Sequence, residues 1–456
     1  MGTHYLKDRT IAVIGAGPAG IFAAREMNDA SAEVALINRD IKPGGLAEYG
    51  IFHNKYKMKK GLRNQFRKSL ADPQLHYFGN VTVGEEKDIN LEEIKEMGFD
   101  AILVTVGAQG TKWLGLPGEE LDGVYHAKDL VYHYNKLPPY SEQEFGIGER
   151  VICIGVGNVM MDIAHWCIRD LKVKEVTAVA RRGPAEVKFT KKEMTILFNN
   201  LDVKHLEEEV ERTRSVMEGV GQDADAAKDF ILSAGAKAEE PVSDSRFRLD
   251  FLASPKAIVG DENGKVIGLE VDETTLEMRD GGGTKAVRTG ETRVIEADTV
   301  IFCIGDRVDD AFGLPLDKWK DYAKNPEPKF PVEDISHESY DPEAGEWVEG
   351  LFLAGWAREA STGLVGAARK DGTRAAQAII YYLEHEPAQP EHIDPIKLLS
   401  ERLKELDKAV IDKHDIQNLE EVESAKANEM GLPEFKFGSN EEMLMAMESM
   451  EKAAQS

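Results

Sequence analysis

Short apolar runs recur along the chain, and the early ones lead into glycine or a helix-forming segment. Residues 10–14, 34–37 and 101–106 form a first group, and residues 151–154 and 176–179 form a second. Apolar runs of this length without polar alternation are typical of parallel strands buried on both faces. The pattern predicts two strand–helix–strand units, one beginning near residue 10 and the other near residue 150.

The first run leads into Gly15-x-Gly17-x-x-Gly20 and then into residues with helix-forming composition. The first glycine of this spacing permits a tight turn, the second lets the backbone approach a pyrophosphate, and the third lets helix and strand pack closely. The helix start also presents free N–H groups to the phosphates. The motif predicts a dinucleotide site in the first unit.

The position after the second strand is unusual for such a site. An acidic residue commonly binds the ribose hydroxyls there, and this chain has Asn38. An amide can hydrogen-bond a hydroxyl, although without a negative charge to strengthen the bond. Asp40 is the alternative ribose ligand.

The second unit repeats the motif as Gly-Val-Gly-Asn at 155–158, and its next strand ends at Arg181 and Arg182. Guanidinium groups pair with phosphates through two hydrogen bonds, so adjacent arginines at this position suit the 2′-phosphate of NADPH. A solvated basic turn is the alternative. Farther along, residues 354–365 offer N–H groups at a helix start for the polar edge of a flavin. Trp356 is expected to flank that ring or else to be a core aromatic.

Charge and cysteine content narrow the possible functions. The 456 residues include 56 Lys and Arg against 82 Asp and Glu, a net charge of −26, which argues against general binding to nucleic acid or anionic membranes. The three cysteines form no C-x-x-C pair, so we expect no disulfide catalysis, iron–sulfur cluster or metal site. No signal peptide or long apolar run is evident, so a soluble cytoplasmic protein is expected.

Longer strings carry a family resemblance over nearly the whole chain. They include Pro-Gly-Gly-Leu-Ala-Glu-Tyr-Gly at 43–50, Arg-Arg-Gly-Pro at 181–184, Phe-Thr-x-x-Glu at 189–193, and Gly-Trp at 355–356 with Thr-Gly at 362–363. With these strings in this order, the sequence resembles the adrenodoxin reductase family of ferredoxin–NADP reductases. The resemblance implies the glutathione-reductase-like fold, which is an α/β fold of two Rossmann-like three-layer domains, the second inserted into the first. It also implies FAD and NADPH or NADP+ as cofactors.

The resemblance implies roles for individual residues as well. Asp162 matches a family helix aspartate, for which an ordinary first-turn acid is the alternative. The family's histidine near the flavin falls on Lys55, so either His53, two residues earlier, or Lys55 itself replaces it, and His53 is the candidate for a proton relay. The expected FAD contacts are Gly15, Gly17, Ala19, Gly20, Asn38, Gly45, Leu46, Val83, Gly107, Gly355, Trp356, Gly363, Leu364 and Val365. The expected NADP contacts are Gly155, Val156, Gly157, Asn158, Val159, Arg181, Arg182, Glu193 and Gly363.

These implications divide the chain into four parts. The FAD-binding domain is expected over 1–108 and 309–395, and the NADP-binding domain over 109–308 with an acidic insertion near 205–240. An acidic helical extension is expected over 396–456. The expected reaction passes a hydride between NADPH and FAD and single electrons between FAD and an iron–sulfur protein such as ferredoxin. The alternatives are the flavin subunit of a larger metal-containing complex, as in the related glutamate synthase small subunit, and a catalytically silent flavoprotein.

A basic stretch between Glu48 and Asp72 contains no acidic residue. It follows the glycine turn at 44–45, so it is expected to lie beside the flavin and to bind an acidic partner. A solvated helix face is the alternative. The candidate docking residues are Lys55, Lys57, Lys59, Lys60, Arg63 and Arg67.

Overall fold

The computed structural model describes residues 6–386 and 394–455. The chain divides into two compact units, which are described separately. Unit 1 comprises Met1–Gly110, Tyr132–Glu142 and Asp306–Ser456, and unit 2 comprises Thr111–Val131 and Gln143–Gly305. No helix in the described ranges combines the length and the apolar character that a membrane span requires.

Unit 1 is built on a six-stranded sheet with the order β15-β16-β4-β1-β2-β3. All neighbouring strands are parallel except the β15–β16 pair, which is antiparallel. The carboxyl ends of β1, β2 and β4 coincide, because Ile14 pairs with Ile37 and with Val104. The strands are β1 (Thr10–Ile14), β2 (Glu33–Ile37), β3 (Leu75–Phe78), β4 (Ala101–Val104), β15 (Glu338–Asp341) and β16 (Glu346–Leu353).

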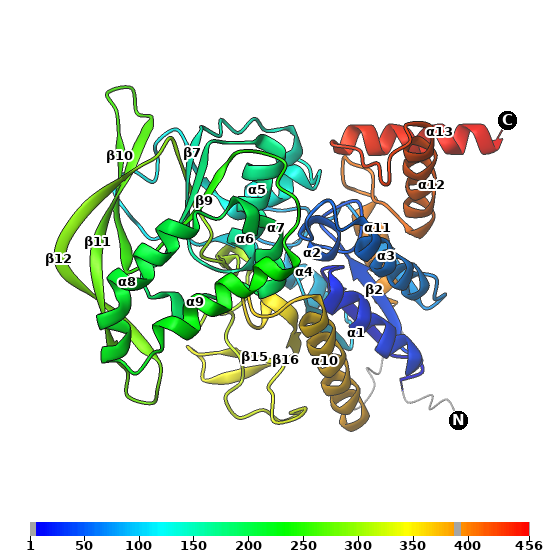
Figure 1. Cartoon of the computed structure of the whole chain (residues 1–456). Helices are drawn as coiled ribbons and strands as arrows, with labels where there is room; N and C mark the ends of the chain where they lie inside the picture. Colours follow the sequence, from blue (N-terminus) through cyan, green and yellow to red (C-terminus); the bar gives the residue numbers. More distant parts are fainter. Residues whose placement is uncertain (1–5, 387–393, 456) are drawn as a thin grey trace. The chain divides into compact units, whose positions relative to one another are not determined.

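Side-chain alternation along β1 gives this sheet a core on both faces. Ile11 and Val13 belong to one buried cluster, and Ala12 and Ile14 belong to another. Helices α1 (Pro18–Asp29) and α10 (Val365–His385) contribute to the first cluster and lie side by side in Figure 1. The strand is therefore apolar at every position because neither face meets solvent.

The remaining helices of unit 1 include the C-terminal extension. Leu419, Phe437 and Met443 from this extension belong to the same buried cluster as α1. The extension is therefore part of the core of unit 1. The helices are α2 (Leu46–Tyr49), α3 (Tyr56–Leu70), α4 (Leu91–Glu96), α11 (Pro395–Leu403), α12 (Lys413–Glu429) and α13 (Asn440–Gln455), and α5 (Ala127–Tyr134) crosses the boundary between the units.

Unit 2 contains a five-stranded parallel sheet with the order β6-β13-β7-β8-β9. Its strands are β6 (Val124–His126), β7 (Arg150–Ile154), β8 (Glu175–Val179), β9 (Arg246–Asp250) and β13 (Thr299–Phe302). Its helices are α6 (Asn158–His165), α7 (Lys191–Leu197), α8 (Val203–Gly219) and α9 (Ala224–Leu232), and a π-helical segment, Trp166–Leu171, follows α6. Residues near 205–240 thus form mainly the helices α8 and α9, and Leu206 and Val210 of α8 are buried.

A separate antiparallel sheet in unit 2 consists of β10 (Ala253–Gly260), β11 (Val266–Met278) and β12 (Thr284–Glu296). Figure 1 shows β11 and β12 as a long curved ribbon. One register shift between Asp272 and Thr274 interrupts their pairing. The predicted α/β class with two parallel-sheet units and C-terminal helices is confirmed.

Candidate functional site

The glycine turn after β1 in unit 1 has the geometry of a phosphate cradle. Gly15 has a φ of +108°, and a Cβ there would lie 2.6 Å from the carbonyl oxygen of Thr105. A Cβ on Gly20 would lie 2.0 Å from the oxygen of Gly15, whereas a Cβ on Gly17 would meet nothing within 4 Å. Gly15 and Gly20 are therefore required by close backbone packing, and Gly17 leaves space for a ligand.

The first turn of α1 leaves backbone donors for an anion. Gly17 is the N-cap, no side chain caps the helix, and no acidic residue occupies its first turn. Such a helix start carries a partial positive charge and unpaired N–H groups. The turn and the helix start together fit the pyrophosphate of a dinucleotide.

Asn38, at the end of β2, is engaged inside unit 1. Its Oδ1 accepts a hydrogen bond from the backbone N–H of Ala16 at 3.0 Å. Its Nδ2 donates to the carbonyl oxygens of Asp40 at 2.8 Å and Lys42 at 3.2 Å and lies 3.2 Å from the hydroxyl of Tyr77. The side chain is 6 % exposed. Asn38 thus joins β2 to the glycine turn, a role that the sequence pattern did not indicate.

The neighbouring charged pair is more accessible. Arg39 Nε donates to Asp40 Oδ1 at 2.9 Å, and its Nη1 donates to Gln109 Oε1 at 2.9 Å. The Arg39 side chain is 39 % exposed, against 14 % for Asp40. Of this pair, the guanidinium of Arg39 is the more exposed group, and Asp40, the alternative ribose ligand, is already paired with it.

Residues 44–50 close over the same turn. The N–H of Gly44 donates to the oxygen of Ala16 at 2.7 Å. A Cβ on Gly45, whose φ is +48°, would lie 3.2 Å from Cα of Gly17. The backbone of Gly45 and the start of α2 at Leu46 therefore adjoin the predicted phosphate cradle.

A second helix start meets α1 at this edge of the sheet. A Cβ on Gly355 would lie 2.8 Å from Cβ of Ala19, and a Cβ on Gly372 would lie 2.1 Å from the oxygen of Ala19. Helix α10 begins at Val365 with Leu364 as its N-cap and no side-chain cap, and Leu364 is 72 % exposed. The structure thus brings the segments that follow β1, β2 and β16 to one edge of the sheet.

Trp356 and Asp371 shape the turn that precedes α10. Trp356 is half-buried, and its Nε1 donates to the oxygen of Thr362 at 2.9 Å. Asp371 Oδ2 accepts from the N–H of Gly355 at 2.7 Å, and its carboxylate pairs with Arg358 at 2.7 Å. Sequence reasoning missed this buried pair, because nothing local to Asp371 or Arg358 marks them as partners.

Two other predicted FAD residues, Gly107 and Val83, and the predicted proton-relay residue His53 also lie in unit 1. Gly107 has a φ of +74°, and Val83 packs against the second core cluster. The ring of His53 lies 4.5 Å from that of Phe52 and 5.9 Å from that of Tyr134. His53 is thus part of an aromatic group, and its proton-relay role stays a prediction.

The glycine turn after β7 in unit 2 follows the same geometry. Gly155 has a φ of +120°, and a Cβ there would lie 2.5 Å from the oxygen of Cys303. Gly157 is the uncapped start of α6, and a Cβ there would meet nothing within 4 Å. Val156 accepts the N–H groups of Lys188 and Phe189 through its oxygen, and Asn158 Oδ1 accepts that of Thr190 at 2.9 Å. This second cradle fits another pyrophosphate.

The two arginines after β8 differ in their surroundings. Arg182 Nη1 pairs with Glu186 Oε2 at 2.9 Å and is part-buried. Arg181 is exposed, and the described residues offer it no ion pair. Arg181 is therefore the arginine whose charge is available to a phosphate.

The remaining predicted residues of unit 2 lie on its helices. Glu193 is in the first turn of α7, whose N-cap Thr190 accepts the Glu193 N–H, and Val159 of α6 is 42 % exposed. Asp162 lies one turn into α6 and is half-buried. Its helical position is that of the family aspartate, and its catalytic role stays a prediction.

The basic stretch over α3 requires a correction. Lys59 is only 1 % exposed and pairs with Glu434 at 3.3 Å, and Arg63 pairs with Glu48 and with Glu434. Arg67 pairs with Glu420 at 2.7 Å. These three residues therefore do not form an unopposed docking surface, because acidic residues distant in the sequence neutralise them. Lys57 and Lys60 are exposed, and Lys55 is half-buried.

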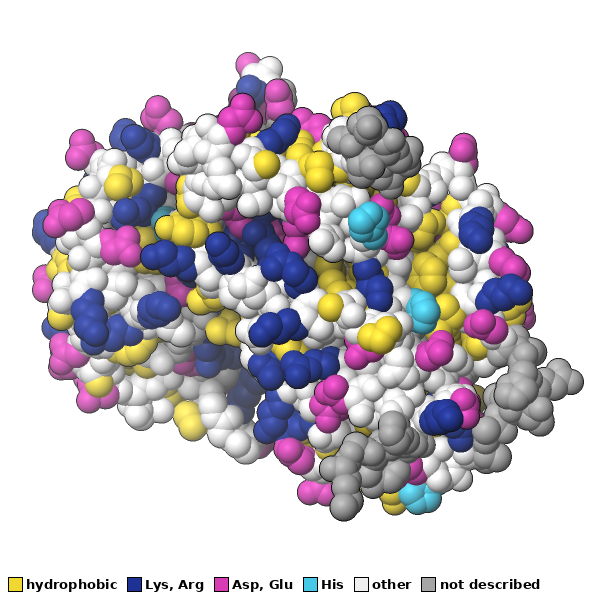
Figure 2. All heavy atoms as spheres, turned by 90° about the vertical axis from the view of Figure 1, so that its right-hand side faces the viewer, with side chains coloured by type: hydrophobic (Ala, Val, Ile, Leu, Met, Phe, Trp, Pro, Cys, Tyr) yellow, Lys and Arg dark blue, Asp and Glu magenta, His cyan; other side chains and the backbone are white. Residues whose placement is uncertain are grey.

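Charge is distributed unevenly over the surface. Figure 2 shows a face on which acidic and basic side chains are interspersed, with Lys and Arg concentrated near its middle. The net charge of −26 therefore does not describe every patch. Local attraction of an acidic partner is compatible with long-range repulsion.

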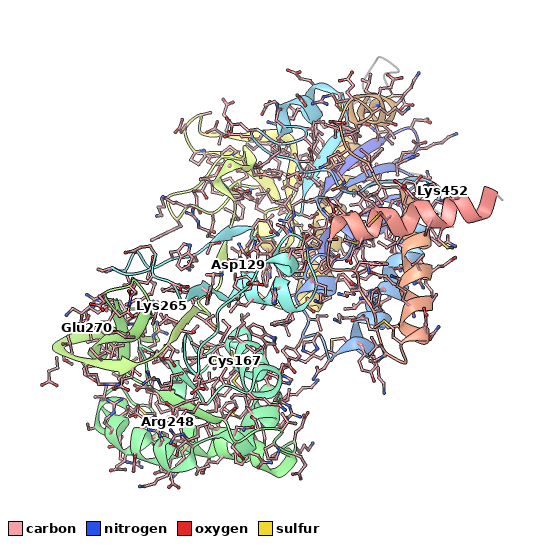
Figure 3. The ribbon with its side chains drawn as sticks, turned by 90° about the horizontal axis from the view of Figure 1, so that it is seen from above. Asp129, Cys167, Arg248, Lys265, Glu270 and Lys452 are labelled. Atoms are coloured by element: carbon pink, nitrogen blue, oxygen red, sulfur yellow. The ribbon has the colours of Figure 1, made fainter. Side chains whose placement is uncertain are left out.

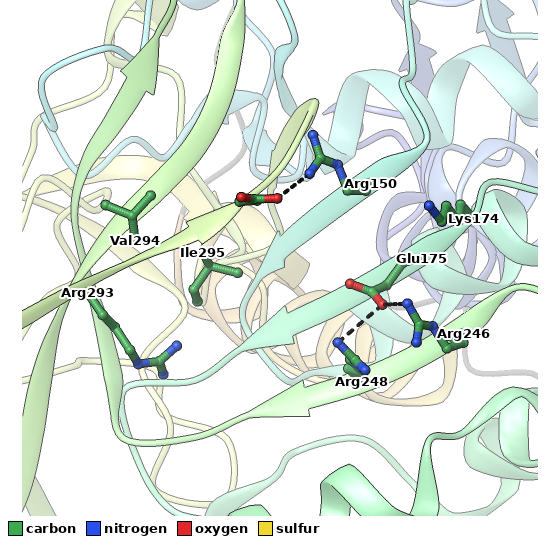
Figure 4. Close-up of a pocket in the computed structure, with 9 residues that line it drawn as sticks. Arg150, Lys174, Glu175, Arg246, Arg248, Arg293, Val294 and Ile295 are labelled. Carbon is green, nitrogen blue, oxygen red and sulfur yellow. Dashed lines mark hydrogen bonds and ion pairs between the residues drawn. The ribbon is translucent and has the colours of Figure 1, made fainter.

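A hollow of about 450 Å³ in unit 2 lies away from the glycine turn. It is lined by Arg150, Glu175 and Arg246, which begin β7, β8 and β9 (Figure 4). Dinucleotides bind at the opposite, carboxyl ends of such strands. The residues that line the hollow form a network of ion pairs, in which Glu175 pairs with Arg246 at 2.9 Å and with Arg248 at 3.3 Å.

The three cysteines are free thiols and are buried. Cys167, labelled in Figure 3, lies inside unit 2. Burial raises the pKa of the Cys167 thiol well above its ordinary value. Because all three thiols are buried, none has the accessibility that a catalytic thiol requires.

Two mainly parallel sheets, each with a glycine cradle at a helix start, define the class of oxidoreductases that bind two dinucleotides. The family model described as pyridine nucleotide-disulphide oxidoreductase matches residues 9–246, which is more than half of the chain. The chain belongs to this family. Its three cysteines are buried free thiols, and the expected absence of disulfide catalysis stays a prediction.

Comparison with individual proteins confirms the resemblance to adrenodoxin reductases. The NADPH-ferredoxin reductase FprA of Mycobacterium leprae is 28 % identical over 95 % of this chain and 97 % of its own length. The mitochondrial NADPH:adrenodoxin oxidoreductase of Arabidopsis thaliana is 27 % identical, covering 78 % of each chain. The structure of Mycobacterium tuberculosis FprA in complex with NADPH has a TM-score of 0.80 at 25 % identity, covering 96 % of this chain and 99 % of that one.

Proposed function

We propose that this chain is an FAD-dependent oxidoreductase of the ferredoxin–NADP reductase type. The observation that carries the proposal is the pair of cradles, at Gly17 and at Gly157, each open where a ligand would approach and each at an uncapped helix start. FAD occupies the cradle of unit 1 and NADPH that of unit 2. The similarity to FprA over nearly its whole length supports this assignment.

The residues of unit 1 have roles that follow from their positions. The N–H groups at the start of α1 bind the pyrophosphate of FAD, and Gly45 and Leu46 cover it. The N–H groups at the start of α10 would bind the polar edge of the flavin, and Trp356 would flank its ring. Bound FAD would supply the chemistry of hydride transfer with NADPH and of single-electron transfer.

In unit 2, the start of α6 binds the pyrophosphate of NADPH and Arg181 binds its 2′-phosphate. Position and electrostatics suffice for hydride transfer, which requires no nucleophile. Because the described cysteines are buried thiols, the electrons leave to a separate iron–sulfur protein. The cytoplasm remains the predicted compartment.

Anaerobic titration of the purified protein tests the proposal. We expect a flavin spectrum that NADPH bleaches at lower concentration than NADH does. With a plant-type [2Fe–2S] ferredoxin added, NADPH should then reduce cytochrome c. A protein reconstituted with FAD that shows no flavin absorbance after gel filtration, or no bleaching by either nucleotide, would overturn the proposal.

A further inference from the structure

Seven charged side chains form a buried cluster between the C-terminal extension and the start of unit 1. Figure 1 shows the two groups of elements involved, α2 and α3 on one side and α12 and α13 on the other. Five of these side chains are at most 7 % exposed. The cluster consists of Lys42, Glu48, Lys59, Arg63, Glu423, Glu434 and Lys436.

Lys436 joins the C-terminal extension to the short helix α2. Its Nζ lies 2.7 Å from Glu48 Oε1 and donates to the carbonyl oxygen of Glu48 at 2.9 Å. It also lies 4.9 Å from the centre of the Tyr49 ring. One residue of the C-terminal extension thus binds the carboxylate, the backbone and the aromatic neighbour within the short helix α2.

Glu434 and Glu423 are the two carboxylates that the extension contributes to the cluster. Glu434 pairs with Arg63 at 2.6 Å and with Lys59 at 3.3 Å, both on α3. Glu423 of α12 pairs with Lys42, which itself lies 3.7 Å from Glu48. The extension therefore contacts the segment 42–50 near both of its ends.

Residues 42–50 also lie against the phosphate cradle. Gly44 binds the oxygen of Ala16, and Gly45 approaches Gly17. Lys42 lies two positions before Gly44, and Glu48 lies three positions after Gly45. A displacement of the cluster would therefore move the backbone that adjoins the cradle.

Desolvating so many charges is costly, and apolar residues of similar volume would stabilise a core at least as well. The cluster holds four cations and three carboxylates, which leaves one positive charge uncompensated. An excess positive charge close to a pyrophosphate site attracts the anionic ligand.

We propose that Lys436 and Glu434 are positioning residues for the FAD site, holding residues 42–50 against the cradle and contributing a positive charge to it. The proposal rests on the proposed function, because it assumes FAD in unit 1. It gives the C-terminal extension a role in cofactor binding that no sequence motif indicates.

The titration of Lys436 provides a specific signature. Its pKa is lowered to about 8, mainly by burial and also by Lys59, Lys42 and Arg63, while Glu48 opposes the change. Glu434 and Glu423 are the other carboxylates of the cluster, and the ring of Tyr49 also faces the amine. Loss of this proton removes the uncompensated positive charge. FAD should therefore dissociate more readily above about pH 8.

The experiment measures the FAD dissociation constant of the full chain by flavin fluorescence from pH 6.5 to 9.5. For the wild type we expect a rise of about three- to tenfold across pH 8. Lys436→Met should bind FAD about three- to tenfold more weakly at pH 7 with no step at pH 8. Glu434→Gln increases the net positive charge of the cluster but frees Lys59 and Arg63 from their shared partner. It should therefore bind FAD more weakly at pH 7 if position outweighs charge, which separates the two effects.

Two further variants make the result decisive. Lys436→Arg keeps the charge at every pH, so it should bind FAD like the wild type at pH 7 and show no alkaline step. Lys452→Met removes an exposed lysine of α13 and should change nothing. Thermal unfolding of the FAD-free proteins identifies variants that fail to fold, in which case Lys436→Arg alone decides.

The two proposals fail in different ways. If the wild type binds no FAD, the proposed function fails. If the wild type binds FAD without an alkaline step, or if Lys436→Met and Glu434→Gln match its affinity, only the positioning role of the extension is refuted.

Discussion

The side chain of Asn38 accepts a hydrogen bond from the backbone N–H of Ala16 at 3.0 Å, inside the first glycine turn. The same amide donates to the carbonyl oxygens of Asp40 and Lys42. Both polar atoms of Asn38 are therefore committed to the backbone around the cradle. A residue that both accepts and donates is required there, and a carboxylate meets only half of that requirement.

We predict that Asn38→Asp weakens both the fold and FAD binding. The carboxylate keeps the bond from Ala16 but faces two carbonyl oxygens without a hydrogen to offer. The cost of such a buried mismatch is about 1–3 kcal/mol. Urea unfolding and the FAD dissociation constant measure the two effects.

Asn28→Asp is the matched control for this change. Asn28 is also buried, and its Nδ2 donates to the oxygen of Ala32 at 3.0 Å, but it lies at the far end of α1 from the glycine turn. It should lower stability while leaving FAD affinity nearly unchanged. Equal losses of FAD affinity in both variants would contradict a specific role for Asn38.

Arg181 and Arg182 are predicted to differ in nucleotide selection. Arg181→Ala should raise the dissociation constant for NADPH about tenfold or more, since a hydrogen-bonded charge pair contributes about 1.5–3 kcal/mol. Binding of NADH should hardly change, because NADH has no 2′-phosphate. Isothermal titration with both nucleotides tests this, and a parallel loss for NADH would refute the assignment.

Arg182→Ala provides the comparison. It breaks the 2.9 Å pair with Glu186, so its main expected effect is on stability, with a smaller loss of NADPH selectivity. If Arg182→Ala abolishes the preference for NADPH and Arg181→Ala does not, the two roles are reversed.

We predict that the exposed lysines of α3 contribute to docking of an acidic iron–sulfur protein. The double variant Lys57→Glu/Lys60→Glu should slow cytochrome c reduction through ferredoxin and reverse its salt dependence. Reduction of ferricyanide by NADPH should stay unchanged, because this small acceptor needs no docking. Lys265→Glu, on the β10–β11 turn of unit 2 (Figure 3), is the control reversal. An unchanged ferredoxin rate in the double variant would exclude docking at these lysines.

Local patterns predicted the parts of the molecule that depend on local geometry. The glycine turns follow from their spacing, because Gly20 contacts the nearby oxygen of Gly15, and Gly15 and Gly155 have positive φ values of +108° and +120°. The buried cluster could not be predicted in this way. Lys59 and Arg63 look unopposed in the sequence, yet their partner Glu434 comes from the C-terminal extension.

The hydrogen bonds of Asn38 could not be predicted from its residue type for a related reason. An amide after the second strand suits a ribose hydroxyl, but its hydrogen-bonding groups are used by Ala16 and by the backbone that follows β2. Only the fold shows which partner an amide binds. The exposure of the neighbouring Arg39 could not be predicted either, since it depends on the pairing with Asp40 and Gln109.

Glu48 is predicted to make the stability of unit 1 sensitive to acid. Burial alone would raise the pKa of this carboxyl, but Lys436, Lys42 and Arg63 outweigh burial and hold it well below the ordinary value of 4.5. A carboxyl with a lowered folded-state pKa contributes stability above its unfolded-state pKa and loses it as the pH falls toward the folded value. The contribution of Glu48 should therefore be complete at pH 7 and decline below about pH 4.5.

Glu48→Gln tests this contribution directly. It leaves three buried cations short of a carboxylate, so the free energy of unfolding at pH 7 should fall by about 3–5 kcal/mol. The variant should also lose less stability than the wild type between pH 5 and pH 3, because it lacks the titrating group. Glu420→Gln breaks the pair with Arg67, whose side chain is 56 % exposed, and should cost about 1 kcal/mol or less. Guanidinium unfolding at several pH values measures the free energy of unfolding of the wild type and both variants. If the two variants lose the same amount of stability, burial does not strengthen the ion pairs of the cluster.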